Sequence, residues 1–450
     1  NAVWTPMTRI LSSIFALLLS TSILLTGHGL QMILGPLLGL ELAFSELEIG
    51  YTGSAYYAGF IAGCLFIPRL IQKVGHIRVF LVLISLATVA LLMLGISQTL
   101  LFWLLARALS GASFSGLYMI IESWLSESAT PENRGLVLSI YSVITLLAIS
   151  AGQMFITLEL PLTQLVMVAA ILFLLSTLPV GLTNSASPQP LHPVTFKFRK
   201  VYNDSRIAIY GALVCGLVTS GFWALGPIIA KALHFEANQI SIFMAVTLMG
   251  GALLQLPIGR FSDLVDRRLV ISALSGAASL VTLSTIVLGL ESPSAFFIVM
   301  FLFGGATFPL YSISLAHAND NSTLSPIETG SVILLTYSIG AVIGPVLISA
   351  TLALSNLGLY FITTLILAPF SAWTFIRSQA IPATQAHFTP YQDVPVTTQE
   401  VILLSTDEDL DEVLDDAADD VLAEVFDEVF DEVLAAPLDS ATPVPSTTAA

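Results

Sequence analysis

Long apolar runs that are nearly free of charge recur between Ile10 and Ile376, and they constrain the fold more than any other feature of this chain. Runs of about 18 residues or more are typical of helices that cross the hydrocarbon core of a bilayer. The composition agrees, because 55% of the 450 residues are apolar and 10% are charged, whereas soluble domains average about 25% charged residues. We therefore expect an all-α integral membrane protein, and an array of soluble domains is excluded.

Glycines, prolines and charged clusters divide these runs into twelve expected helices, each of about the 20 residues that span a bilayer. The expected ranges are approximately 9–38, 46–71, 77–97, 99–126, 134–158, 161–183, 206–232, 237–262, 268–290, 293–319, 327–353 and 356–378. They predict two six-helix bundles, residues 1–183 and 206–378. A segment at 184–205, rich in Pro and Ser and then basic, is expected to be a cytoplasmic linker.

The acidity of the chain belongs to its C-terminal tail. Residues 379–450 carry 17 acidic residues and no Lys or Arg, whereas residues 1–378 carry 15 basic and 14 acidic residues. In the tail, acidic pairs alternate with apolar pairs such as Val413-Leu414 and Val425-Phe426. Two interpretations stay open: a disordered, solvated tail, or a partly helical segment that docks on a protein partner or on the basic cytoplasmic loops.

The distribution of Lys and Arg over short loops predicts the orientation in the membrane. With the N-terminus in the cytoplasm, 13 of the 15 basic residues lie on the cytoplasmic side. The exceptions are Arg107, inside the fourth expected helix, and Lys231, at the outer end of the seventh. We therefore expect a multi-pass protein of the plasma membrane, or of the inner membrane in a Gram-negative cell, with both termini in the cytoplasm.

The two halves of the chain repeat each other. The segment from Ser110 to Tyr118 in the fourth expected helix resembles the segment from Gly304 to Tyr311 in the tenth, and Tyr141-Ser-Val-Ile resembles Tyr337-Ser-Ile-Gly. The order and the approximate spacing agree. A duplicated six-helix unit is a common transporter architecture, in which the substrate binds between the repeats near the middle of the bilayer.

Several motifs resemble those of the major facilitator superfamily. The loop Gly259–Arg268 resembles the family motif G-x-x-x-D-x-x-G-R-R, with Asp266 in place of the second glycine. Arg107–Gly111 resembles the R-x-x-x-G motif of the fourth helix, and Glu122–Trp124 and His317–Asp320 resemble the YcaD-like branch. The resemblance implies a fold of twelve transmembrane helices in two pseudo-symmetric six-helix bundles.

The same resemblance implies a secondary active transporter that moves a small solute by rocking two bundles about a central cavity, and we expect proton coupling. The alternative is a transporter-fold scaffold or assembly factor that recruits a protein through the acidic tail. The sequence has no Gly-rich phosphate loop, no zinc-ligand spacing and no catalytic triad. We expect neither an enzyme nor an ATP-driven pump, with no metal, cofactor or nucleic-acid partner.

Arg107 is the leading candidate for substrate binding or proton coupling. It lies roughly 12 Å into its expected helix, and an intramembrane charge costs at least about 2.5 kcal/mol unless it faces a cavity or a partner. The alternative is an arginine that holds helix ends through backbone carbonyls. No carboxylate lies near the middle of any expected span, which slightly favours a neutral or anionic substrate. The other substrate or coupling candidates, for each of which plain packing is the alternative, are His28, Gln31, Gln153, Trp223 and Gln255.

A second group of charged residues is expected at the cytoplasmic ends of the helices. Glu122 lies near the end of the fourth helix, and Arg134 begins the next helix on the same side, so the two can pair when the cytoplasmic mouth is closed. A solvated helix end is the alternative. The spacing of Asp263 and Arg267 is suited to pairing at a hinge. The full set of gate candidates is Glu122, Arg134, Asp263, Arg267, Arg268, His317, Asn319 and Asp320.

Overall fold

The computed structural model describes residues 4–128, 134–182, 197–288 and 292–380. The first half contains α1 (Trp4–Glu41), α2 (Glu46–Val74), α3 (His76–Met93), α4 (Leu100–Ser128), α5 (Arg134–Met154), the 3-10 turn η1 (Phe155–Leu158) and α6 (Leu162–Gly181). The second half contains α8 (Arg206–Ala232), α9 (Ala237–Ser262), α10 (Arg267–Leu288), α11 (Pro293–Asn321), α12 (Pro326–Leu352) and α13 (Gly358–Ala380). From residue 381 onward the acidic tail lies outside the described residues.

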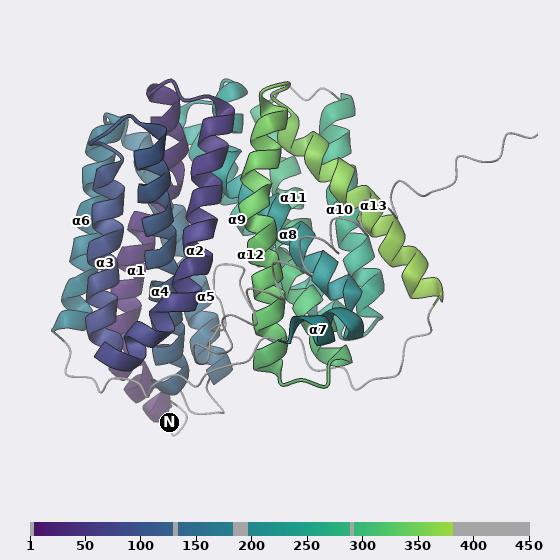
Figure 1. Cartoon of the computed structure of the whole chain (residues 1–450), viewed down its shortest axis with the longest axis horizontal. Coiled ribbons are helices and arrows are strands. Elements are labelled where there is room, and N and C mark those ends of the chain that lie inside the picture. Colours follow the sequence, from purple (N-terminus) through teal and green to yellow (C-terminus); the bar gives the residue numbers. More distant parts are fainter. Residues whose placement is uncertain (1–3, 129–133, 183–196, 289–291, 381–450) are drawn as a thin grey trace, which may run out of the picture. The chain divides into compact units, whose positions relative to one another are not determined.

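Twelve helices of the described residues are long and apolar enough to cross a membrane, which confirms the expected all-α membrane fold. In Figure 1, α1–α6 lie on one side and α8–α13 on the other. One short helix was not expected: α7 (Phe198–Asp204) forms in the basic part of the linker. Lys197, just before α7, forms an ion pair of 2.9 Å with Glu328 of α12, so this part of the linker is attached to the second half.

Helix starts follow from local capping. The Ser45 hydroxyl accepts a hydrogen bond from the Glu48 backbone N–H, and the Glu48 carboxylate accepts one from the Ser45 N–H at 2.8 Å. Ser325 and Glu328 form the same capping box at the start of α12. These reciprocal bonds satisfy donors that a helix N-terminus otherwise leaves without a partner.

The two halves pack their helices in the same pattern. In the first half α2 packs on α4, α1 on α5 and α3 on α4; in the second, α9 packs on α11, α8 on α12 and α10 on α11. Glycines at matching places allow the closest approaches. A Cβ added to Gly111 of α4 would overlap the Tyr56 carbonyl of α2, and one added to Gly304 of α11 would overlap the Thr247 carbonyl of α9. The repeat noted in the sequence is thus also a repeat of packing.

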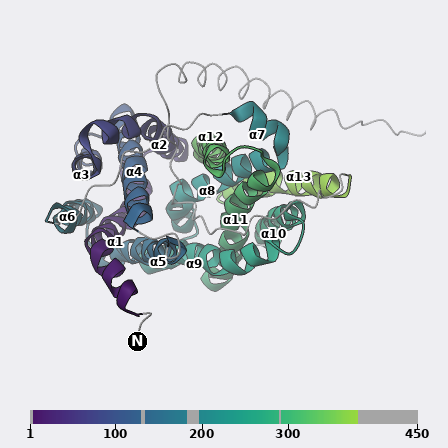
Figure 2. The ribbon, with the colours of Figure 1, turned by 90° about the horizontal axis from the view of Figure 1, so that it is seen from below.

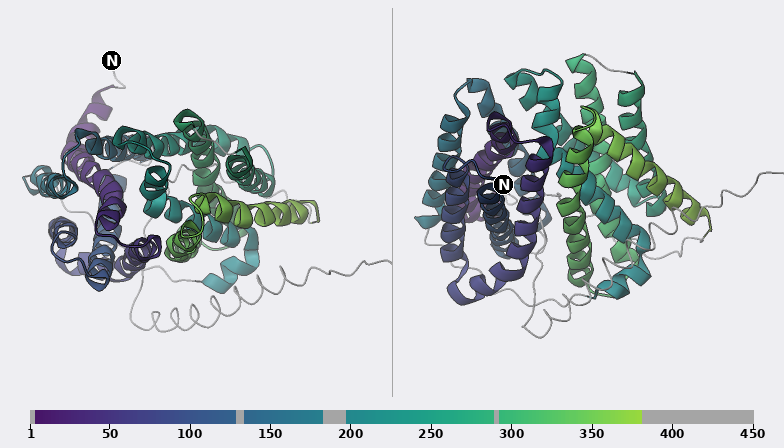
Figure 3. Two further views of the ribbon diagram at one scale, coloured as in Figure 1. Left: turned by 90° about the horizontal axis from the view of Figure 1, so that it is seen from above. Right: turned by 45° about the horizontal axis from the view of Figure 1, so that its top comes forward.

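The halves meet through α2 with α12, α5 with α9, and α1 with α8. Figure 2 shows α2 beside α12 and α5 beside α9. Two hydrogen bonds join the halves toward the end that carries the α1–α2 loop. The Ser54 hydroxyl donates to the Val342 carbonyl at 2.5 Å, and the Ser241 hydroxyl donates to the Gln153 carbonyl at 2.8 Å. We call this the α1–α2 end; it lies at the top of Figure 1 and is seen from above in the left panel of Figure 3.

Candidate functional site

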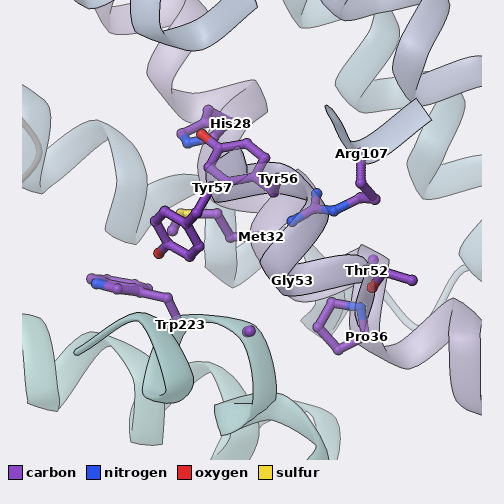
Figure 4. Close-up of a pocket in the computed structure, with 11 residues that line it drawn as sticks. His28, Met32, Pro36, Thr52, Gly53, Tyr56, Tyr57, Arg107 and Trp223 are labelled. Atoms are coloured by element: carbon purple, nitrogen blue, oxygen red, sulfur yellow. The ribbon is translucent and has the colours of Figure 1, made fainter. Parts of the chain in front are cut away.

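A pocket lies between the halves, where α1, α2 and α4 of the first half face α8 of the second (Figure 4). The empty space at this place, counted together with the solvent into which it opens, is about 450 Å³. Three of the residues singled out in the sequence, His28, Arg107 and Trp223, line it together. The lining also includes Pro36, Thr52, Gly53, Tyr56, Tyr57 and Ala224.

The Arg107 guanidinium lies over the ring of Tyr56, with its Cζ atom 4.8 Å from the ring centroid. A cation over an aromatic face is attracted by the ring quadrupole. No carboxylate or carbonyl among the described residues accepts a hydrogen bond from this guanidinium. Figure 4 shows it pointing into the pocket. Its donors are therefore available to a ligand, and a guanidinium can hold a carboxylate or phosphate through two parallel hydrogen bonds.

His28 is fixed in the wall of the pocket by contacts on two sides. Its ring stacks on Phe114, with the centroids 3.8 Å apart. Its Nδ1 atom lies 3.3 Å from the Gln31 amide oxygen, and the Gln31 amide nitrogen donates to the Ser110 hydroxyl at 2.9 Å. Because an amide oxygen only accepts, Nδ1 is the donor in the first contact. The chain His28–Gln31–Ser110 thus links α1 to α4 beside Arg107.

Trp223 faces the pocket from α8. Its ring stacks on Phe308 at 5.9 Å between centroids, with 12° between the planes, and it also contacts Phe222. These aromatic neighbours hold the indole in place from the side of the second half.

The structure places two of the glutamines away from this pocket. Gln255 of α9 donates to the Ser312 hydroxyl of α11 at 3.4 Å, within the second half. Gln153 lies at the end of α5, where its carbonyl accepts the bond from Ser241. Both polar atoms of the Gln153 side chain are buried without a hydrogen-bond partner among the described residues. Such an amide is expected to raise the free energy of this arrangement.

Glu122 is buried inside the first half, with 7% of its surface exposed. It lies within electrostatic range of Tyr118, Tyr141 and Cys64. The side chain of Arg134, its expected partner, lies outside the described residues. The Glu122–Arg134 pair therefore stays a prediction.

The other gate candidates gather at the α9–α10 loop of the second half. Arg267, 1% exposed, contacts Asp320 of α11 at 3.0 Å and Asp263 at 3.0 Å. Arg268 forms a bidentate pair with Asp266, whose closest contact is 2.7 Å. This cluster joins α9, α10 and α11 and does not include Glu122.

Asp266 is the member of this cluster that the sequence motif does not predict. Partial burial acts to raise its pKa, but hydrogen bonds from the Arg268 side chain and backbone outweigh burial and hold the pKa below its ordinary value. The carboxylate therefore stays ionised at neutral pH. Next to the cluster, the Asn321 amide donates to the His317 ring at 3.2 Å, and Asn319 Oδ1 is buried without a donor among the described residues.

The pocket residues that sequence reasoning did not single out are chiefly Tyr56 and Tyr57 of α2. A signal for them was present. The pair stands between small residues, Gly53 and Gly59, which allow α8 and α4 to approach α2 closely. Gly53 meets the second half and Gly59 meets α4, so the pair stands on the part of α2 that lies between α4 and α8.

Comparison with known proteins agrees with this architecture. The family model described as Major Facilitator Superfamily matches residues 17–321 and 208–406. A protein named "Uncharacterized MFS-type transporter YcaD" from Salmonella arizonae is 26% identical over 324 residues, which cover 70% of this chain and 82% of that protein. The protein of the same name from Salmonella typhi matches with the same identity and coverage.

Two solved structures are similar in fold. One is a bacterial homolog to the human lysosomal transporter Spinster, in an inward-facing and occupied conformation, with a TM-score of 0.68 and 13% identity over 83% of this chain and 98% of that chain. The other is the nucleoside transporter NupG, with a TM-score of 0.65 and 12% identity over 82% of this chain and 98% of that chain. At these identities the likeness establishes the fold alone.

Proposed function

Because the chain belongs to the major facilitator superfamily, a family of membrane transporters, we propose that it is a secondary active transporter of a small anionic solute. The resemblance that the loop and fourth-helix motifs carry, including the likeness to YcaD-type proteins, is confirmed by these matches. The proposal goes further in three respects: the charge of the solute, its binding at the pocket of Arg107, and coupling to protons.

The observation that carries the proposal is the Arg107 guanidinium, which faces the pocket with the Tyr56 ring beside it and no carboxylate paired to it among the described residues. A guanidinium that is removed from bulk water needs an opposite charge or hydrogen-bond acceptors. An anionic group of the solute supplies both when it binds. A cationic solute would instead add a second positive charge to the same space.

Alternating access fits the position of the pocket between the halves. Gly53 packs on Ala224 toward the α1–α2 end, so that the pocket is covered on that side. With the N-terminus in the cytoplasm, as the basic loops predict, this is the outer end, and the conformation is one that faces inward. Rocking of the halves would separate the α1–α2 end and open the pocket to the other side.

Proton coupling is proposed for two buried groups of the first half, His28 in the pocket wall and Glu122 farther along α4. A carboxyl group changes its charge when it takes up a proton. Inside a helix bundle, such a change shifts the balance between conformations that bury this group to different extents.

Flux into proteoliposomes tests the proposal. A panel of small organic acids and their neutral amides is compared for the wild type, Arg107→Lys and Arg107→Ala, with the melting temperature measured in parallel. We expect the wild type to carry the acids but not the amides. Uptake of the acids by Arg107→Lys is expected to be at least about tenfold slower, because lysine cannot form the bidentate pair. We expect no uptake by Arg107→Ala. Arg260→Lys, at an exposed arginine, is the matched control. Wild-type flux in Arg107→Lys with a lowered melting temperature would show a purely structural arginine.

A further inference from the structure

We propose that the solute is an aromatic carboxylate: one carboxyl group attached directly to a flat, unsaturated ring. This inference rests on the proposed function, since it names the body of the anion that Arg107 holds. It follows from the chemistry of the surfaces that surround the guanidinium.

The pocket offers a charge on one side and aromatic rings on the other. Figure 4 shows the Arg107 guanidinium on one side, with Tyr57 and Trp223 on the opposite side and Tyr56 between them. A carboxylate that pairs with Arg107 therefore directs the rest of its molecule toward Tyr57 and Trp223. Aromatic rings attract one another in stacked and edge-to-face arrangements beyond the effect of buried area.

The rings are positioned before any ligand binds. Tyr56 packs edge-on against Tyr57, with centroids 5.3 Å apart and 88° between the planes. Trp223 is held by its stack on Phe308. Rings that are already held in place lose little conformational entropy when a ligand ring packs on them.

Apart from Arg107, the polar side chains of the lining are Thr52, His28 and the aromatic residues Tyr56, Tyr57 and Trp223. The Thr52 hydroxyl donates to the Ile49 carbonyl at 2.8 Å, and the His28 ring is bonded to Gln31. The other polar atoms of the lining, the hydroxyls of Tyr56 and Tyr57 and the indole N–H of Trp223, lie at the edges of flat aromatic rings. The lining favours a body with an apolar, flat surface.

The space also limits the size of that body. Pro36, Gly53 and Ala224 line the pocket toward the α1–α2 end, where a Cβ on Gly53 would lie 2.6 Å from the Ala224 Cβ. This contact limits how far the body of the solute extends toward the α1–α2 end. A compact ring that carries its carboxylate directly meets this limit.

Three probes of similar size separate the contribution of the charge from that of the ring: benzoate, cyclohexanecarboxylate and benzamide. Their dissociation constants are measured by calorimetry on the purified full chain. We expect benzoate to bind at least about tenfold more tightly than cyclohexanecarboxylate, which corresponds to about 1.4 kcal/mol, and benzamide to bind more weakly than benzoate by at least the same factor.

Two variants assign the preference to the pocket. Trp223→Leu is expected to reduce the preference for benzoate over cyclohexanecarboxylate to about threefold or less, whereas Trp373→Leu, whose ring packs on Tyr210 and Phe370, is expected to keep it. If Trp223→Leu does not fold, Tyr57→Leu takes its place. If neither variant folds, the comparison of the three probes on the wild type tests the proposal by itself.

The possible results separate the two ideas. Equal affinities for benzoate and cyclohexanecarboxylate, or no binding of either at millimolar concentration while other acids are carried, overturn the aromatic carboxylate and leave anion transport in place. The proposed role of Arg107 is overturned if benzamide binds as tightly as benzoate and Arg107→Gln leaves the dissociation constant of benzoate unchanged.

Discussion

Arg107 and Glu122 stand on the same helix, α4, about 22 Å apart along its axis. The first lies in the pocket between the halves, and the second is buried within the first half beside tyrosines. A charge that is placed so far from the pocket does not touch a solute that occupies it. If both residues act in transport, their functions are separable by experiment: Arg107 in binding, and Glu122 in the response to protons.

Glu122→Gln tests this separation. Glutamine resembles the protonated carboxyl group and cannot ionise. We expect the variant to exchange labelled for unlabelled solute across the membrane at a rate close to that of the wild type, but to lose accumulation driven by a pH gradient. Both are measured in the same proteoliposomes. Glu159→Gln, at an exposed position, serves as the control, and accumulation that persists in Glu122→Gln would remove Glu122 from the coupling step.

The ion pair between α10 and α11 is the clearest energetic link between elements. Arg267 and Asp320 are both nearly buried, 1% and 5% exposed. Removal of one partner of a buried pair destabilises a protein by about 3–5 kcal/mol, because the other charge is left buried. Since Asp263 still contacts Arg267, we expect Asp320→Asn to lower the free energy of unfolding by about 3 kcal/mol, the lower part of that range.

Thermal unfolding in detergent measures this effect, with Asp204→Asn, at an exposed residue of α7, as the control. The double variant Arg267→Met/Asp320→Leu replaces the pair by apolar side chains and is expected to recover most of the loss. A double variant no more stable than Asp320→Asn would show that the arginine contributes through other contacts.

At the α1–α2 end, Gly53 of α2 packs closely on the second half. A Cβ at Gly53 would lie 2.6 Å from the Ala224 Cβ and 3.0 Å from the Pro345 Cβ. Overpacking of this kind costs about 1–3 kcal/mol, so we expect Gly53→Ala to reduce the ratio of closed to open α1–α2 ends by about 5- to 150-fold. The shift cannot exceed the difference between the cost of the added methyl group in the closed conformation and its cost in the open one.

Spin labels on Glu41→Cys and Asn238→Cys report this opening as a longer distance across the α1–α2 end. The native Cys64 and Cys215 are buried and leave the labelling specific. Gly181→Ala, where nothing lies within 4 Å of an added Cβ, is the control. An unchanged distance distribution in Gly53→Ala would mean that the interface accommodates the methyl group without opening.

The elements were largely predictable from the sequence, and their relative rotation was not. The length of an apolar run sets where a spanning helix begins and ends to within a few residues, but α7 is too short for such a signal. Depth in the bilayer follows from counting residues, so Arg107 could be singled out. Which face of a helix meets the other half does not follow from counting, and for that reason Gln255 was grouped with the pocket, whereas Tyr57 was not.

At the scale of the whole molecule, the orientation in the membrane rests on the basic loops and is open to a direct test. We expect cysteines introduced between residues 188 and 204 to react with an impermeant maleimide only after the membrane is permeabilised, and a cysteine at Glu41 to react in intact cells. The reason is the preference of short Lys- and Arg-rich loops for the cytoplasm. Labelling of both positions in intact cells would contradict the twelve-span topology with an internal N-terminus.

The acidic tail distinguishes a transporter from a scaffold. The residues that line the pocket belong to α1, α2, α4 and α8, whereas residues 381–450 lie outside the described residues. We therefore expect a chain that ends at Ala380 to retain transport within about twofold of the full chain in proteoliposomes, normalised to the amount inserted. A loss of transport on truncation, with the melting temperature unchanged, would favour a function that depends on a partner of the tail.

The unsatisfied amide of Gln153 has a consequence for the timing of a transport cycle. Its two polar side-chain atoms are buried where α5 meets α9, and an amide in that state costs about 1–3 kcal/mol. We expect the cost to apply while the α1–α2 end is closed and to disappear when water reaches the amide. We expect it to shorten the dwell time of the closed conformation, and the turnover number of a carrier depends on its longest dwell time. We therefore expect Gln153→Leu, which removes the amide, to change how fast the molecule cycles and not which solute it selects.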